Sequence, residues 1–262
     1  MTLWTVITSC CRLDNLQVLI QQLIESYCAA KDILNLTQLT ICVIDDHTPG
    51  FSKKAIKTIA DNYEDILIEV NVNTTRLGKH QFWRTINKAI VSANRADADY
   101  FLWLQDDNLL DNNFVEEAIK QWDAIENPNK AILTLRVEEC RAGAKQWTNF
   151  TPVLVQYGDY EFWHTDWFDM QGICGRRFFE ILNYEILPVP KIRWKKYKKL
   201  SSGVGQQISK RLVKAGATAY QAKYSLIKLN ENLPSVMHTW RPKGYFKIVI
   251  NENNDGNETS TS

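Results

Sequence analysis

Two pairs of neighbouring carboxylates are the residues of this sequence best suited to chemistry. Asp45 and Asp46 follow one short apolar run, and Asp106 and Asp107 follow another. Adjacent carboxylates repel each other, and a hard divalent cation with oxygen ligands is a common compensation. Carboxylate ligands favour Mg²⁺ or Mn²⁺ over softer metals. The alternative for Asp106 and Asp107 is a helix start, where carboxylates interact favourably with the helix dipole.

Alternating strand-like and helix-like segments precede and follow these pairs. The expected strands are Leu3–Thr8, Leu39–Ile44, Ile66–Val72 and Tyr100–Leu104, and the expected helices are Asp14–Tyr27, Lys53–Tyr63 and Gln81–Ala93. Strands separated by helices predict βαβ units and a mostly parallel sheet. Ligands of such sheets bind outside the carboxyl ends of the strands. We therefore expect the two acidic pairs to converge on one crevice.

The second half of the chain changes character. We expect helices at Phe114–Ile125, Gly175–Tyr184 and Val204–Ala215, and strands at Ala131–Val137 and within Thr218–Leu229. The segment Arg141–Trp167 is rich in aromatic and turn residues. No linker is visible, so residues 1–250 are expected to form one domain, with residues 1–110 and 111–250 as its halves. Residues 251–262 contain no apolar side chain and are expected to be a disordered tail.

Composition excludes several classes of protein. The chain has 262 residues, 45% hydrophobic and 23% charged, which is ordinary for a globular protein and excludes a disordered chain, a collagen or a coiled coil. The 31 Lys and Arg residues balance 30 Asp and Glu, so a polyanionic partner would need a local patch. Most of the nine Trp residues are expected in the core, with stacking on sugars or bases for a few.

Cysteine usage and hydropathy predict the compartment. The six cysteines include no C-x-x-C pair, which disfavours zinc and a disulfide framework and favours reduced thiols. Neither a signal peptide nor an apolar run of spanning length is visible. We therefore expect a soluble, cytoplasmic protein without a transmembrane segment.

The order of four motifs resembles a known family. These motifs are Ser9-Cys-Cys-Arg12, Ile41-Cys-Val-Ile-Asp45-Asp46, Asn73…Leu77-Gly78-Lys79…Asn87 and Tyr100-Phe-Leu-Trp-Leu-Gln-Asp106-Asp107-Asn108. They resemble the nucleotide-sugar-binding half of the family-2-type glycosyltransferases of GT-A fold. Further on, Gln171-Gly-Ile-Cys-Gly-Arg-Arg177 resembles the family's acceptor-side glycine and Arg-Arg segment, Gln206…Gly216 resembles its late helix, and His238 resembles its late histidine. The resemblance implies a GT-A-like three-layer α/β/α fold with a mostly parallel central sheet and an elaborated acceptor-side second half.

The resemblance also implies roles in binding the nucleotide. Asp45 would accept hydrogen bonds from the uracil or ribose, Asp46 is a weaker candidate beside it, and Arg12 lies on the loop that borders the base. Lys79 and Arg84 would add positive charge near the phosphates, although solvation at the surface is the alternative for Lys79. The donor would be a nucleoside-diphosphate sugar, with UDP as the expected nucleotide, and the resemblance implies a hexosyl transfer with inversion.

The expected metal is Mn²⁺ or Mg²⁺. By resemblance, Asp107 would be its main ligand, supported by Asp106 and by His238. The metal would neutralise the charge that develops on the nucleoside-diphosphate leaving group.

Two departures from the family pattern concern catalysis. Gln105 stands where the family's acidic motif opens with Asp, and Val204-Gly205 stand where its Glu-Asp pair contributes the general base. An inverting transfer still needs a base for the acceptor hydroxyl. Asp169 and Asp166 are the nearest acidic candidates, and hydrogen bonding within their aromatic loop is the alternative role for both.

A basic stretch raises the question of the acceptor. Cations meet phosphates and aromatic rings stack on bases, so the stretch suggests 5-hydroxymethylpyrimidine in phage-type DNA. A solvated face, an anionic lipid surface and a cell-envelope polysaccharide or lipid acceptor are the alternatives. The residues concerned are Lys191, Arg193, Trp194, Lys195, Lys196, Lys198 and Lys199.

Two other functions fit parts of the pattern. A non-catalytic relative would keep the nucleotide pocket without a base, as Gln105 and Val204-Gly205 suggest. A sugar nucleotidyltransferase would require a Gly-rich basic loop after the first strand, and Ser9-Cys-Cys-Arg12 is not such a loop.

Overall fold

The computed structural model describes residues 1–136, 151–168, 170–196, 201–230 and 232–233. Its strands are β1 (Thr2–Ser9), β2 (Gln38–Asp45), β3 (Ile66–Val72), β4 (Tyr100–Gln105), β5 (Asn108–Leu110), β6 (Lys130–Thr134), β7 (Val153–Tyr157), β8 (Tyr160–Thr165), β9 (Gly172–Cys174), β10 (Thr218–Ala222) and β11 (Ile227–Leu229). Its helices are α1 (Leu13–Leu34), α2 (Lys53–Lys57), the 3₁₀ turn η1 (Thr58–Ala60), α3 (Phe82–Arg95), α4 (Phe114–Ala124), α6 (Arg176–Ile181), α7 (Ile192–Lys196) and α8 (Val204–Lys214).

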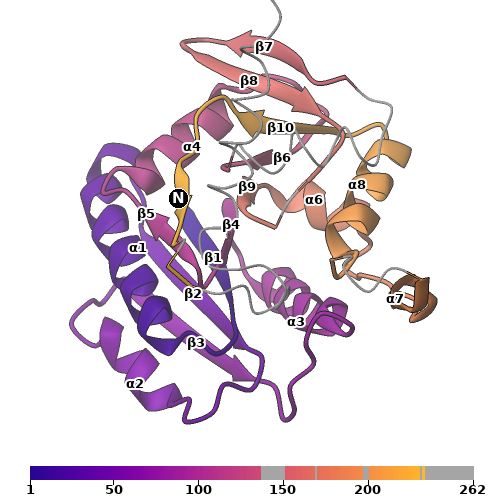
Figure 1. Ribbon diagram of the computed structural model, residues 1–262. Coiled ribbons are helices and arrows are strands. Elements are labelled where there is room, and N and C mark those ends of the chain that lie inside the picture. Colours follow the sequence, from indigo (N-terminus) through magenta and orange to yellow (C-terminus); the bar gives the residue numbers. More distant parts are fainter. Residues whose placement is uncertain (137–150, 169, 197–200, 231, 234–262) are drawn as a thin grey trace, which may run out of the picture.

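Nine of these strands form one sheet in the order β3-β2-β1-β4-β9-β6-β10-β8-β7 (Figure 1). The first four are mutually parallel, and β6 and β10 pair in parallel, whereas β9 and β8 run antiparallel to their neighbours. The mostly parallel sheet expected from the sequence is therefore confirmed. A second, two-stranded sheet joins β5 to β11.

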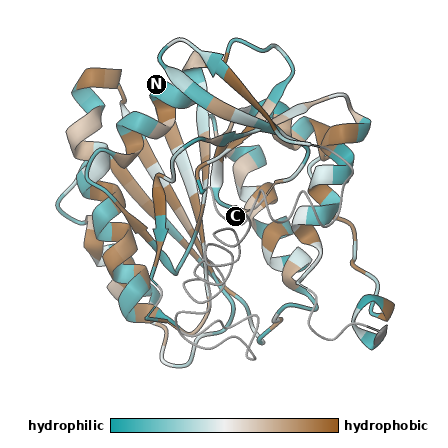
Figure 2. Cartoon of the chain, turned by 45° about the horizontal axis from the view of Figure 1, so that its top comes forward, coloured by the Kyte–Doolittle hydropathy of each residue, from teal (hydrophilic) through white to brown (hydrophobic). Residues whose placement is uncertain are grey.

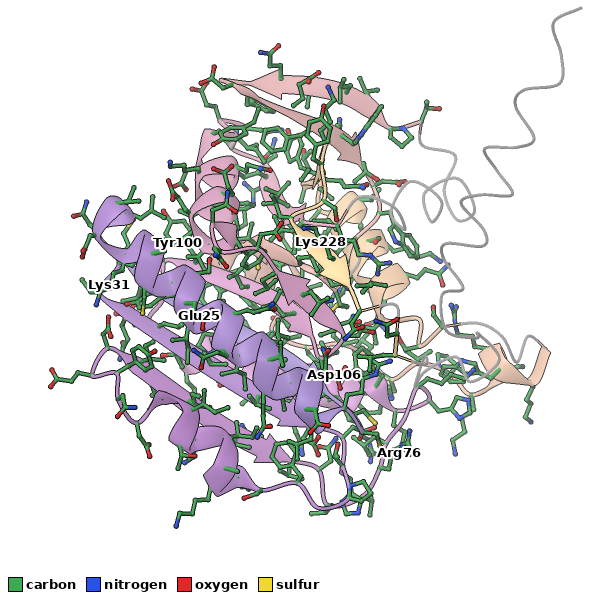
Figure 3. The ribbon with its side chains drawn as sticks, turned by 60° about the vertical axis from the view of Figure 1, so that its left-hand side comes forward. Glu25, Lys31, Arg76, Tyr100, Asp106 and Lys228 are labelled. Atoms are coloured by element: carbon green, nitrogen blue, oxygen red, sulfur yellow. The ribbon has the colours of Figure 1, made fainter. Side chains whose placement is uncertain are left out.

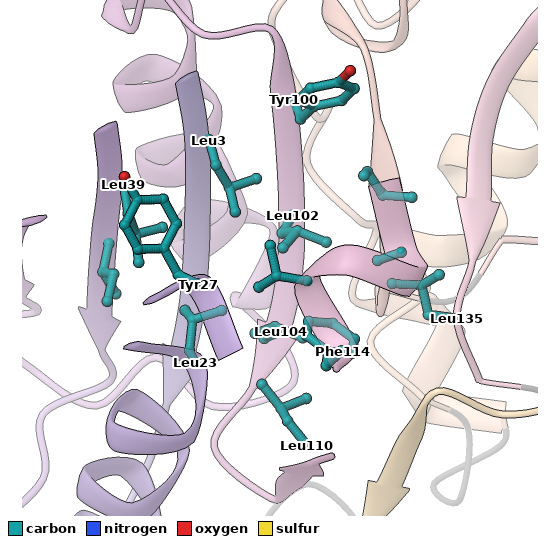
Figure 4. Packing of buried hydrophobic residues seen from close by; sticks show 14 of the residues in the cluster. Leu3, Leu23, Tyr27, Leu39, Tyr100, Leu102, Leu104, Leu110, Phe114 and Leu135 are labelled. Atoms are coloured by element: carbon teal, nitrogen blue, oxygen red, sulfur yellow. The ribbon is translucent and has the colours of Figure 1, made fainter. Parts of the chain in front are cut away.

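Helices cover both faces of the sheet, which gives three layers. Alternate residues of each strand point to opposite faces, and both sets are apolar because both faces are buried. One set packs with α1 and α4, and the other packs with α3, α6 and α8. Figure 2 shows hydrophobic residues along the strands and on the helix faces turned toward them. Leu23 and Tyr27 of α1 belong to the first of these clusters, together with Leu3, Leu39 and Leu102 of the strands (Figure 4).

Strand β9 is inserted where the two halves of the sheet meet. It pairs antiparallel with β4 on one side and with β6 on the other. Gly172 starts this strand, and a Cβ atom on it would lie 2.5 Å from the backbone oxygen of Leu133. Only glycine fits so close an approach between strands. Gly172, the first glycine of the Gln171–Arg177 motif, therefore has a packing role.

Several elements differ from the sequence-based expectation. The helix expected at Lys53–Tyr63 ends as α2 at Lys57 and continues only as the 3₁₀ turn η1. Part of the aromatic segment Arg141–Trp167 is the hairpin of β7 and β8, which extends the sheet. The expected disordered tail, residues 251–262, lies outside the described residues. Within the described part of the chain, no helix has the length and apolarity needed to cross a membrane.

Candidate nucleotide-sugar site

The carboxyl ends of β1, β2 and β4 lie side by side and bring the two acidic pairs to one edge of the sheet. The ladder continues beyond the strands, since the backbone N–H of Asp46 donates to the Ser9 oxygen at 2.8 Å and that of Asp106 donates to the Thr8 oxygen at 3.0 Å. The loop after β1, which carries Arg12, therefore lies between the two pairs. The sequence-based expectation that both pairs meet at one edge is confirmed.

Arg12 connects the two carboxylates of the second pair. Its Nη1 lies 2.9 Å from Asp106 Oδ1 and 2.8 Å from Asp107 Oδ2. Asp106 also accepts a hydrogen bond of 2.6 Å from the backbone N–H of Cys10. Asp106 is only 4% exposed, whereas the Asp107 side chain is 21% exposed and lies at the rim. Asp107 is therefore the more accessible carboxylate of the pair.

Burial dominates the electrostatics of Asp106. It raises the pKa of this carboxyl above its ordinary value, and the negative charge of Asp107 raises the pKa further. Arg12 and the Cys10 N–H act in the opposite direction, because both interact favourably with the ionised form. Asp106 therefore depends on the positive charge of Arg12 to remain ionised.

A network of asparagines holds the turn that presents these two aspartates. Asn108 Oδ1 accepts from the backbone N–H of Gln105 at 2.8 Å. The side chain of Asn15, in the first turn of α1, donates to the backbone oxygen of Asp106. Asn230 donates through its backbone to the oxygen of Asp107 at 2.8 Å and through its side chain to Asn15 at 2.7 Å. Sequence reasoning missed Asn15 and Asn230, since no local pattern distinguishes them from ordinary helix and loop asparagines.

Asp45 is fully buried and is already used within its loop. Its Oδ2 accepts from the backbone N–H of Thr48 at 2.7 Å, and its Oδ1 accepts from the Thr48 hydroxyl at 2.6 Å. The same hydroxyl accepts from the backbone N–H of Cys11 at 2.7 Å. Asp45 thus ties the loop after β2 to the loop after β1. A carboxylate can accept more than two hydrogen bonds, so Asp45 keeps acceptor capacity beyond these contacts.

Replacement of Asp45 by alanine is expected to weaken UDP binding by about 10-fold to 100-fold, the worth of a hydrogen bond to a charged group. The loss should be the same for every sugar attached to UDP, because the base and ribose are common to all of them. Calorimetric titration with UDP and several UDP-sugars measures it. Thr48→Val is the control, since it removes the two internal bonds of the hydroxyl, to Asp45 and from Cys11, and keeps the Asp45 carboxylate. An equal loss in both variants, or a loss for one sugar alone, would contradict the assignment.

Asp46 organises the loop after β3. It accepts from the side chain of Asn73 at 2.9 Å and from the backbone N–H groups of Leu77 and Gly78, each at 2.8 Å. Asn73 is itself 3% exposed. Three donors occupy this carboxylate, so its established contacts are with the chain itself. The same loop carries Arg76, an exposed residue whose charge acts on Cys10.

Of the basic residues near the site, sequence reasoning selected Lys79 and Arg84 and missed Arg76. Figure 3 places Arg76 at the end of the molecule that carries Asp106. Lys79 is half-buried in the same loop. Arg84 is exposed on α3, with its guanidinium 5.2 Å from the ring centre of Trp83, and lines a groove of about 770 Å³ between α3 and the outer strands β2 and β3. Arg76, whose charge acts on Cys10, is therefore a further candidate cation for a phosphate at the carboxyl edge, in the same loop as Lys79.

The donor set at Asp106 and Asp107 fits a hard divalent cation that is completed by a ligand. Both side chains offer carboxylate oxygens, and Mg²⁺ sites are often built from one or two carboxylates with substrate phosphates and water. Within the described residues, no group of three or more His, Cys, Asp or Glu could hold a metal ion. His238, the third expected ligand, lies outside the described residues.

Of the two aspartates expected as the general base, Asp166 lies among the described residues. Asp166 is half-buried after β8, and its charge acts on His164, whose pKa is lowered by burial. Asp169 lies outside the described residues. The two aspartates therefore remain candidates for this role.

Structural roles explain the missing acidic pair at Val204-Gly205. Val204 is fully buried, and a Cβ atom on Gly205 would lie 2.9 Å from the backbone oxygen of Phe168. A side chain at position 205 would therefore clash with the backbone, and a carboxylate at position 204 would be buried away from water. Gln206 accepts from Arg193 at 2.8 Å, and Gln207 makes two bonds to the backbone of Leu187. These hydrogen bonds connect α8 to α7 and to the segment that precedes α7.

The structure corrects part of the interpretation of the basic stretch. Trp194 is 6% exposed, packs 4.5 Å from the ring of His80, and donates to the Ser201 oxygen at 3.2 Å. Arg193 packs against Gly203 and binds Gln206. Trp194 is therefore not available to stack on a base, and Arg193 serves the fold.

The remaining cations of the stretch divide into two groups. Lys191 and Lys195 are exposed, and Ile192 between them is 72% exposed. Lys198 and Lys199 lie outside the described residues, as does the side chain of Lys196.

Comparison with known proteins shows the fold. The sequence matches no family model and no curated protein. A mannosyltransferase from Pyrobaculum calidifontis, in complex with GDP-Man and Mn²⁺, is similar with a TM-score of 0.58 and 14% identity. The match covers 95% of this chain and 64% of the mannosyltransferase, so the chain spans slightly less than two thirds of that protein.

Two further solved structures are similar. GalNAc-T7 with UDP, GalNAc and Mn²⁺ has a TM-score of 0.51 at 12% identity, covering 84% of this chain and 41% of its own. A mycobacterial protein has a TM-score of 0.50 at 11% identity, covering 87% and 67%. The chain therefore has the GT-A-like fold of glycosyltransferases, as the sequence motifs led us to expect.

Proposed function

We propose that this chain is a glycosyltransferase that moves a sugar from a nucleoside-diphosphate sugar to an acceptor hydroxyl. The observation that carries the proposal is the position of Asp107 at the rim of the carboxyl edge, beside Arg12 and the buried Asp106, in a GT-A-like sheet. Ligands of such sheets bind at this edge. Two structures of similar fold were solved with nucleotides and Mn²⁺, which supports the same ligand class here.

In this proposal each residue has a separate task. Asp45 binds the base or ribose, and Arg76 and Lys79 face the phosphates. Asp107, supported by Asp106, holds Mn²⁺ or Mg²⁺, which supplies positive charge to the leaving diphosphate. With direct inversion, Asp166 or Asp169 accepts the proton of the attacking hydroxyl. UDP is the donor nucleotide we expect, as the family resemblance implies.

A panel of nucleotide sugars tests the donor. Thermal shift with and without Mn²⁺ is expected to select one nucleotide class, because base and ribose contacts are shared within a class. The selected donor should then release its nucleoside diphosphate slowly in the presence of metal, since water replaces the acceptor. If no nucleotide sugar raises the melting temperature under either condition, the proposal fails.

The second candidate is a nucleotide-sugar-binding protein without transferase activity. Gly205 and Val204 favour it, because a side chain at position 205 would clash with the backbone and position 204 is buried, so neither position suits the general base of the family that the chain resembles. The two candidates differ in one measurement. A binding protein stabilised by a UDP-sugar should release no UDP, and Asp166→Asn should leave its behaviour unchanged. In a transferase that uses Asp166, the same variant should lose turnover and keep binding.

The acceptor divides into two testable possibilities. The first is 5-hydroxymethylpyrimidine DNA. Because Trp194 is buried, this DNA would be bound through Lys191 and Lys195. The second is an acceptor at a lipid surface, as in cell-envelope synthesis. The exposed Ile192 between two lysines favours it, because apolar and basic side chains together suit an anionic membrane surface.

Salt dependence and one substitution separate these acceptors. DNA binding should weaken with salt, with a slope of log K against log salt of about −0.9 per duplex phosphate or −0.7 per single-strand phosphate. Lys191→Gln with Lys195→Gln should flatten that slope. Ile192→Asn should instead weaken binding to vesicles that contain phosphatidylglycerol and leave DNA binding unchanged. If the parent chain binds no DNA at low salt, the DNA acceptor is excluded.

A further inference from the structure

Arg12 occupies the position from which a cation neutralises the second acidic pair. A single nitrogen, Nη1, contacts Oδ1 of Asp106 at 2.9 Å and Oδ2 of Asp107 at 2.8 Å. The Arg12 side chain is 9% exposed and the Asp106 side chain is 6% exposed, so water screens these charges little. The chain therefore supplies its own positive charge to the pair.

A divalent cation at Asp107 would have to share this position. One of the two Asp107 oxygens already accepts from Arg12, and the other accepts a long bond of 3.4 Å from the Asn108 side chain. A metal bound to this carboxylate would lie close to the guanidinium in a partly buried setting, where like charges repel strongly. With Arg12 in place, the positive charge of the guanidinium offsets part of the negative charge of the pair, so the pair attracts a dication less strongly.

We infer that Arg12 competes with the divalent cation for Asp107, so that the metal binds tightly only together with a nucleoside diphosphate. This inference rests on the proposed function. The diphosphate adds negative charge beside the pair, and this charge offsets both Arg12 and the metal. By linkage, the factor by which UDP tightens metal binding equals the factor by which the metal tightens UDP binding. Arg12 is in this sense a positioning residue for the carboxylates.

Titration of the full chain with Mn²⁺ alone tests this competition. Calorimetry or the electron paramagnetic resonance signal of free Mn²⁺ gives the affinity without any turnover. The parent is expected to bind Mn²⁺ at least 10-fold more tightly when UDP is present. Arg12→Gln is expected to bind Mn²⁺ alone at least 10-fold more tightly than the parent does. Arg95→Gln, which removes an exposed positive charge on α3 away from the carboxylates, is the control and should match the parent.

Two results would overturn the inference. One is equal Mn²⁺ affinity of the parent with and without UDP, a measurement that needs no variant. The other is an Arg12→Gln variant that remains folded by circular dichroism and binds Mn²⁺ alone no better than the parent. If Arg12→Gln does not fold, Arg12→Lys replaces it and should show a smaller gain, because a lysine ammonium is a point charge that cannot reproduce the guanidinium geometry.

The same titrations separate this inference from the proposed function. Tight Mn²⁺ binding by the parent without UDP rejects the competition and leaves a metal-dependent transferase intact. Absence of Mn²⁺ binding under all conditions rejects both the competition and the metal site. UDP binding that persists without metal would then indicate a nucleotide site in which Arg12 itself supplies the charge.

Discussion

Asp107→Asn is expected to abolish the metal-dependent part of UDP binding, lowering the affinity measured with Mn²⁺ by at least about 100-fold, or about 2.7 kcal/mol. An amide carries no negative charge and is a poorer ligand for a hard cation than a carboxylate. The fold should persist, because Asp107 lies at the rim and Arg12 keeps its contact with the buried Asp106. UDP titration with and without Mn²⁺, together with circular dichroism, measures both effects.

Asp111→Asn is the matched control for this substitution. Asp111 lies four residues further along, and its ion pair with Lys228 is more than half exposed on both sides. Exposed pairs contribute little, so this variant should bind UDP and Mn²⁺ as the parent does. His238→Ala should lower the affinity for the metal less than Asp107→Asn does, since a water can replace a neutral ligand. A folded Asp107→Asn protein with the parent's Mn²⁺-dependent affinity would disprove the ligand assignment.

Gly172→Ala is expected to reduce the free energy of unfolding by about 3 kcal/mol, the upper part of the range for overpacked cores. The added Cβ would lie 2.5 Å from the backbone oxygen of Leu133 and 3.2 Å from the Cα of Thr134, and backbone atoms cannot rotate away as a side chain can. For a chain of this size the melting temperature should fall by roughly 6–12 °C. Urea denaturation of parent and variant measures the difference.

Gly175→Ala provides the comparison within the same motif. A Cβ atom there would meet only Cζ2 of Trp122, at an ordinary contact distance of 3.6 Å. Gly175 precedes α6 in an extended conformation that alanine can adopt, so the loss should stay near 1 kcal/mol or less. Equal losses at the two positions would show that the close approach of β9 to β6 is not what requires glycine at position 172.

Local pattern was sufficient for the regular part of the fold. The strands β1 to β4 and the helices α3, α4 and α8 lie where hydrophobic periodicity predicts them, with ends that differ by a few residues. Helix α1 begins where it is expected but continues past Tyr27 to Leu34. Such long periodic segments bury one continuous set of side chains, so their sequence carries a strong signal. The strands β5 and β9 have only three residues each, too few to show a hydrophobic periodicity. Their positions depend on pairing with strands that are distant in the sequence.

The candidate site shows the same division. The two acidic pairs were predicted to meet because both follow buried parallel strands, and the register of those strands brings them together. The partners of these carboxylates were not predictable. Asn230 reaches Asn15 across 215 positions of sequence, and such a contact leaves no mark on the residues next to either one.

The sequence by itself determined the class of fold, the edge of the sheet at which the acidic pairs lie, and the expectation of a nucleotide-sugar ligand. The tertiary structure alone decided what each charged residue contacts. In it, Arg12 forms ion pairs with Asp106 and Asp107, and Asp46 accepts hydrogen bonds from the loop after β3. Trp194 is buried against His80. The physical reason is that periodicity records burial, a property of each segment, whereas a hydrogen bond or ion pair depends on the distance between two segments. That distance is set only when the whole sheet and its loops have packed.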